Sequence, residues 1–182
     1  MLEIDTVAFE LFEEAKRFLE KAEETSDTEG RKAFLHAALL LGISALEAHV
    51  NAIADEMLER GGSNLNPLER SILLEKEYAF VKGEFKLTKK LKMYNLLERI
   101  EFILFKFSGR YINTDVGWWG KLHQGIDMRN SLVHPKDRQD LTSKKVESAF
   151  EGIIGVLDAI YMALYKQHFP ALGRKFDSKM HF

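Results

Sequence analysis

The chain of 182 residues contains no cysteine. This absence excludes structural disulfides, zinc sites with thiolate ligands and thiol nucleophiles. A protein without disulfides is at home in a reducing compartment, so we expect a cytoplasmic location. The first residues, Met1–Asp5, do not combine a basic segment with an apolar one, and we therefore expect no secretory signal.

The sequence also lacks an uninterrupted apolar run long enough to cross a bilayer, which takes about 20 residues. Its longest apolar-rich stretch, residues 37–54, is interrupted by Ser44, Glu47, His49 and Asn51. We interpret this stretch as a buried helix and expect no association with a membrane.

The chain also lacks a large excess of charge of one sign. It contains 26 basic and 28 acidic residues, which gives a formal net charge of −2. This balance excludes strong non-specific nucleic-acid binding by electrostatics alone. The distribution is uneven: residues 1–60 carry 6 Lys and Arg and 14 Asp and Glu, which leaves 20 and 14 for residues 61–182, or −8 and +6. A polyanion would therefore bind the second part, although most single charges are expected to lie on solvated helix faces.

Strand signals are nearly absent, and apolar residues recur at the spacing of α-helices. The predicted helices cover residues 3–24, 29–60, 67–81, 89–107, 115–134 and 141–168. This pattern predicts an all-α fold, an up-and-down bundle of about six helices in a single domain over residues 1–182. We expect the tail after Pro170 to be loose.

The stretch from Arg129 to His134, Arg-Asn-Ser-Leu-Val-His, places a guanidinium, an amide and an imidazole at one helix end. In an unbroken helix Arg129 and His134 would point about 140° apart. Pro135 disfavours the helical conformation at His134, and unwinding there can turn the imidazole toward the guanidinium. The alternative is that Arg129 and Asn130 only cap the helix and His134 only precedes a turn.

The same stretch resembles the motif of HEPN domains from prokaryotic toxin–antitoxin and defence systems. In that motif an arginine and a polar residue, often asparagine, precede a histidine, as Arg129, Asn130 and His134 do here. The apolar helix that carries Glu47 and Asn51 is similar to a helix of several HEPN domains. The resemblance covers residues 31–60 and 115–168, and we interpret residues 61–114 as a family-specific insertion.

The resemblance implies a metal-independent endoribonuclease that acts as a homodimer, with a composite active site at the subunit interface. Arg129 would bind the scissile phosphate, His134 would act as general base or acid, and Asn130 would orient either group. The product would be a 2′,3′-cyclic phosphate. The implied role is a toxin or defence effector, with a nucleotidyltransferase-type antitoxin as its partner.

Glu47 and Asn51 lie four positions apart and share one face of the central helix. Because a buried carboxylate without a partner is costly, we hypothesise that Glu47 pairs with Arg129 and fixes its orientation, with Asn51 in support. The alternative is that Glu47 pairs with an unrelated lysine or reaches solvent.

The densest basic cluster lies in residues 82–92, where Lys89, Lys90 and Lys92 are candidates for RNA binding. The alternative is a solvated helix start. The pair Trp118-Trp119 offers rings that can stack on bases, although such a pair more often belongs to a core.

The histidines lack the spacing of metal ligands, and no glycine-rich phosphate loop is present, so we expect neither a metal nor another cofactor. Two further functions remain open. One is a non-catalytic HEPN-like module that binds RNA, a nucleotide or a protein partner, and the other is a purely structural helical subunit.

Overall fold

The computed structural model describes residues 3–61, 64–134 and 140–182. The elements in these ranges are six α-helices, a two-stranded antiparallel sheet and a short 3-10 helix. In chain order they are α1 (Glu3–Glu24), α2 (Thr28–Gly61), α3 (Pro67–Leu74), β1 (Lys76–Val81), β2 (Glu84–Leu91), α4 (Leu96–Ser108), α5 (Gly117–Val133), α6 (Ser143–Tyr165) and η2 (Leu172–Arg174). The predicted all-α class is confirmed, with one small hairpin added.

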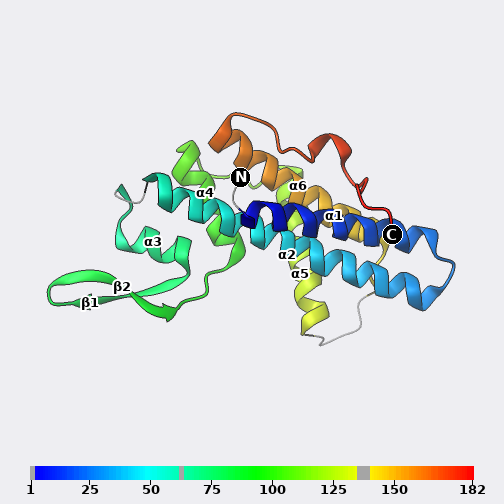
Figure 1. The fold of residues 1–182 in the computed structure, drawn as a ribbon, viewed down its shortest axis with the longest axis horizontal. Helices are drawn as coiled ribbons and strands as arrows, with labels where there is room; N and C mark the ends of the chain where they lie inside the picture. Colours follow the sequence, from blue (N-terminus) through cyan, green and yellow to red (C-terminus); the bar gives the residue numbers. More distant parts are fainter. Residues whose placement is uncertain (1–2, 62–63, 135–139) are drawn as a thin grey trace.

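The long helix α2 lies at the centre of the bundle, as its nearly continuous apolar surface predicts (Figure 1). Helix α1 packs along α2, and α5, α6 and α4 also contact α2. The core therefore forms around α2, and polar side chains on this helix need partners from its neighbours.

Helices α5 and α6 approach each other closely because glycine lies at their contact. A Cβ atom on Gly152 of α6 would lie 2.5 Å from the backbone nitrogen of Leu122 in α5. One turn further along α5, a Cβ atom on Gly125 would lie 2.8 Å from the Cβ atom of Ala149. This contact fixes the position of α5, which carries Arg129 at its C-terminal end.

The helices predicted for residues 67–81 and 89–107 are wrong between residues 75 and 95, where the chain forms the β1–β2 hairpin. Helix α3 ends early because Glu75 adopts a left-handed conformation with φ 50°. The two strands are joined by Lys82 and Gly83, whose φ angles of 52° and 88° fit a tight hairpin turn. The hairpin projects from one end of the bundle (Figure 1).

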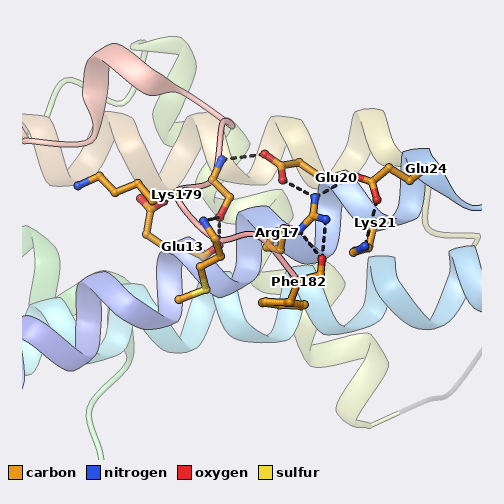
Figure 2. A network of polar contacts seen from close by, with 9 residues as sticks. Glu13, Arg17, Glu20, Lys21, Glu24, Lys179 and Phe182 are labelled. Atoms are coloured by element: carbon orange, nitrogen blue, oxygen red, sulfur yellow. Dashed lines mark hydrogen bonds and ion pairs between the residues drawn. The ribbon is translucent and has the colours of Figure 1, made fainter.

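The expectation of a loose C-terminal tail is also wrong, because the segment after α6 packs on α1. Phe169 and Ala171 are buried in the core. Arg174 donates two hydrogen bonds to the Glu13 carboxylate, at 2.9 and 2.7 Å, and the backbone N–H of Lys179 donates a third at 2.7 Å. Figure 2 shows the tail lying along α1, with Lys179 beside Glu13.

Two helices, α2 and α6, are long and apolar enough to span a membrane by length and composition. Core helices of globular proteins meet the same criterion, and 50% and 44% of the respective apolar windows are buried inside the bundle.

Candidate functional site

The most informative polar contact joins α5 to α2. The Arg129 guanidinium donates through Nη2 to Oε1 of Glu47, as the sequence analysis expected of this pair. Both side chains are partly exposed, 25% for Arg129 and 41% for Glu47. The Nε of Arg129 is buried, and it has no hydrogen-bond partner in the described part of the chain. Glu47 therefore binds one nitrogen of the guanidinium, Nη2, and does not occupy Nη1.

Arg129 and Glu47 lie on the wall of a cavity of about 310 Å³ between the hairpin base and helices α2, α4 and α5. Its polar wall includes Asn51 and Asn130, two further residues of the predicted site. The lining residues are Glu47, Asn51, Glu75, Met93, Tyr94, Asn95, Leu96, Arg99, Ile126, Arg129 and Asn130. Four of the predicted site residues thus meet in one cavity.

A second arginine, Arg99 of α4, lines the same cavity and was missed by the sequence analysis. Its residue surface is only 5% exposed. Its Nη1 donates to Oδ1 of Asn51 at 2.8 Å and lies 3.1 Å from Oε2 of Glu75, while Nη2 donates to the carbonyl of Leu73 at 3.1 Å. The available signal was its place among Leu96, Ile100 and Ile103, on the apolar face of α4.

Burial lowers the pKa of Arg99, and the nearby carboxylates, Glu75 first, oppose this effect. The guanidinium stays charged because the ordinary pKa of arginine is far above neutrality. Asn51 binds Arg99, so the prediction that it supports the Arg129–Glu47 pair is wrong. Asn51 nevertheless lies on the wall of the same cavity.

His134 lies at the end of α5, where its backbone N–H donates to the carbonyl of Asn130 at 2.8 Å. Its φ and ψ angles of −124° and 68° are not helical, as expected for a residue before proline. Pro135 itself lies outside the described residues. The His134 side chain is exposed and does not contribute to the lining of the cavity. Within one chain, the structure therefore brings Arg129, Asn130 and Glu47 together but not His134.

The three candidate lysines lie on the hairpin and just after it, not at a helix start. Lys90 forms an ion pair with Glu77 at 3.1 Å. The Nζ of Lys92 lies 5.7 Å from the ring centre of Tyr78 and 4.8 Å from that of Tyr94, a residue that also lines the cavity. A hydrogen bond with Tyr94 raises the pKa of Lys92. Lys89 is exposed on β2.

Of the two neighbouring tryptophans, Trp119 lies in the core and Trp118 lies at its edge. Trp119 is buried, and its ring meets that of Trp118 edge-on at 5.8 Å. Trp118 is partly buried against Gly155 of α6. These contacts assign Trp119 to the core, so it is not available to stack on a base.

Among the residues that the structure describes, no group of three or more histidine, aspartate or glutamate side chains is placed to hold a metal ion. The polar side chains on the cavity wall include guanidinium, carboxylate and amide groups. A guanidinium with free N–H groups is suited to binding phosphate oxygens.

The sequence model of the family described as RiboL-PSP-HEPN matches residues 8–166, which is more than half of the chain. This match confirms the resemblance inferred from the Arg129–His134 stretch and agrees with the helical fold. A search of curated proteins and a search of solved structures gave no match.

Proposed function

Because the chain belongs to the RiboL-PSP-HEPN family, we propose that it is an endoribonuclease of the HEPN type, which cleaves RNA without a metal ion. The observation that carries the proposal is the ion pair between Arg129 and Glu47 on the cavity wall. A guanidinium held through one nitrogen can present its remaining exposed N–H groups to a phosphate with a smaller loss of entropy on binding.

The exposure of the Glu47–Arg129 pair supports a positioning role. Partly exposed ion pairs contribute less than about 1 kcal/mol to stability, so this pair is a weak stabiliser of the fold. Its effect would be on orientation, because Glu47 on α2 holds the Arg129 guanidinium of α5 through Nη2. Arg129 would bind the scissile phosphate and stabilise the charge that develops on it.

In the proposed reaction, the 2′-hydroxyl oxygen of the substrate attacks the adjacent phosphorus, and the bond from phosphorus to the 5′-oxygen breaks. The proton of the 2′-hydroxyl passes to the imidazole of His134, and the leaving 5′-oxygen takes a proton from an imidazolium or from water. The products are a 2′,3′-cyclic phosphate and a 5′-hydroxyl. No metal is needed because the nucleophile belongs to the substrate.

We place the complete active site at the interface of a homodimer. The exposed position of His134, outside the cavity wall of its own chain, supports a site that a second subunit completes. Asn130 lies between these two parts, since it lines the cavity and its carbonyl accepts the His134 N–H. The proposed role is a cytoplasmic toxin or defence effector, restrained by a nucleotidyltransferase-type antitoxin.

A second candidate is a non-catalytic module that binds RNA, a nucleotide or a protein partner through the same cavity. The absence of His134 from the lining of the cavity favours it, because a ligand can bind to Arg129 without the histidine.

Incubation of the purified protein with RNA in EDTA distinguishes the two candidates. We expect cleavage by the wild type and its loss in Arg129→Ala and His134→Ala. The matched control is His123→Ala, which removes another exposed histidine from α5 and should remain active. Equal inactivity of the wild type and both variants, with RNA still bound, would favour the binding module.

A further inference from the structure

The hairpin carries exposed aromatic side chains on one face. The register pairs Phe80 with Phe85 and Tyr78 with Leu87, so these four side chains share that face. Phe80 is 67% exposed and Phe85 57%, and their ring centres lie 5.2 Å apart. Tyr78 meets Phe85 at 5.9 Å. Because solvation of large apolar rings is unfavourable, an exposed cluster of this kind indicates a binding surface.

The charges of the hairpin are mostly basic. Residues 76–92 contain six lysines and two glutamates, which gives a net charge of +4. The two glutamates pair with Lys86 and Lys90. Lys82 and Lys89 are exposed and have no ion-pair partner in the described ranges. The hairpin thus keeps a net positive charge, although the chain as a whole has a net charge of −2.

The aromatic face leads toward the cavity. Lys92 lies over the rings of both Tyr78, on the hairpin, and Tyr94, on the cavity wall. The chain enters β1 directly from Glu75, another lining residue, whose carbonyl accepts the Lys92 N–H at 2.8 Å. Phe80, Phe85, Tyr78, Lys92 and Tyr94 form a continuous line from the hairpin turn to the cavity, which we call the aromatic track.

We propose that the aromatic track binds single-stranded nucleic acid, whose bases stack on the exposed rings while its phosphates meet the unpaired lysines, and that it directs the strand to Arg129. Alternating rings and ammonium groups match the chemistry of an unpaired strand, which offers a π-face and a negative charge at every nucleotide. A duplex would not fit, because its bases are already stacked. The inference builds on the proposed function, since the delivered strand is the one that Arg129 would hold.

Binding can be measured apart from cleavage by fluorescence anisotropy with a labelled oligodeoxythymidine. This probe has no 2′-hydroxyl, so it cannot undergo the proposed reaction. We expect Phe80→Leu and Phe85→Leu each to weaken binding about tenfold, because leucine keeps the apolar surface but removes the ring. The matched control, Val81→Ser on the opposite hairpin face, should bind like the wild type.

A second variant tests the charges without touching the rings. Replacing Lys82 and Lys89 together by glutamine should reduce the slope of log K against log salt concentration by about 1.4. A circular dichroism spectrum and melting temperature like those of the wild type show that the hairpin variants keep their fold.

Two results would overturn the proposal. One is wild-type affinity for oligodeoxythymidine in both leucine variants. The other is a change of oligomeric state in sedimentation for Phe80→Ser and Phe85→Ser with oligonucleotide affinity unchanged, which would make the face a contact between copies of the chain. Tight binding of the probe together with intact RNA in EDTA would support the track and contradict only the proposed ribonuclease activity.

Discussion

Arg129 of α5 and Glu47 of α2, 82 positions apart in the sequence, form an ion pair on the wall of one cavity. The pair connects the helix end that carries the Arg129–His134 motif to the central helix of the bundle. Its geometry depends on the close contact of α5 with α6, where Gly125 and Gly152 leave room for the two helices to approach.

Glu47→Gln should impair turnover more than stability. The amide keeps the shape of the side chain but loses the charge that orients Arg129, so we expect kcat for RNA cleavage to fall about 10- to 100-fold. The free energy of unfolding should change by less than about 1 kcal/mol, because the pair is partly exposed. Glu59→Gln, at an exposed position of the same helix, is the control and should leave both quantities unchanged. A loss of stability without a loss of kcat would contradict the positioning role.

Arg99→Met should destabilise the protein at the cavity. The substitution leaves the Asn51 amide and the largely buried Glu75 carboxylate without their guanidinium partner, which costs about 2–3 kcal/mol in the free energy of unfolding. Denaturation by urea measures this loss. The exposed Arg70→Met of α3 should change stability little. A midpoint equal to that of the wild type would show that Arg99 does not organise the cavity wall.

Glu13 should make the attachment of the C-terminal tail sensitive to acid. Burial acts to raise the pKa of Glu13, but hydrogen bonds from Arg174, Lys16 and the Lys179 backbone overcome it and lower the pKa from 4.5 to about 2. A carboxyl with a depressed pKa stabilises the folded state fully above pH 4.5, and this contribution is lost as the pH falls from 4.5 toward 2. Its size is at most about 3 kcal/mol.

The Glu13→Gln variant tests this dependence. It should be less stable than the wild type at pH 7, and the difference should shrink as the pH falls below 4.5. Thermal melts across this range measure it, with the exposed Glu10→Gln as the control. A difference that is the same at pH 7 and pH 3 would contradict the assignment.

His49 should add a second pH dependence at milder acidity. It is 1% exposed, its ring meets those of Phe9 at 4.7 Å and Phe169 at 5.5 Å, and burial lowers its pKa from 6.5 to about 4. Below pH 6.5 the unfolded chain takes up a proton that the folded chain does not, so stability falls as the pH drops from 6.5 toward 4. The loss is at most about 3 kcal/mol.

Replacement by leucine should remove this loss. His49→Leu should therefore show a flatter stability curve between pH 7 and pH 4 than the wild type, measured by urea denaturation at each pH. The exposed His123→Gln should keep the wild-type curve. Parallel curves for the wild type and His49→Leu would exclude His49 as the source.

The bundle was predictable because the apolar residues of α1, α2, α5 and α6 recur over long stretches at a spacing that a helix, but not a strand, can bury together. The hairpin escaped detection because its apolar residues, such as Phe80 and Phe85, face solvent and follow no core pattern. Only the Lys82-Gly83 turn signalled it. The docked tail was missed since Arg174 and Glu13 are far apart in the chain, and a contact over that distance has no local signature.

The candidate site was predictable in part. Glu47, Arg129 and Asn130 share the cavity, and the predicted Glu47–Arg129 contact is present. The reason given for that contact was wrong, because the Glu47 carboxylate is not buried: its side chain is 41% exposed. The position of Arg99 on the apolar face of α4 was a weak signal, because a single arginine on such a face can also extend to solvent. The distance of His134 from the cavity depends on the course of the chain after α5, which periodicity does not determine.

The chemical nature of the ends that the protein leaves on RNA tests the central claim most directly. Mass spectrometry of RNA incubated in EDTA should detect 2′,3′-cyclic phosphate and 5′-hydroxyl ends with the wild type. The single-turnover rate should fall by at least about 100-fold in His134→Ala, as expected for the loss of a general base. Intact RNA with the wild type, or equal rates for the wild type and His134→Ala, would contradict the account.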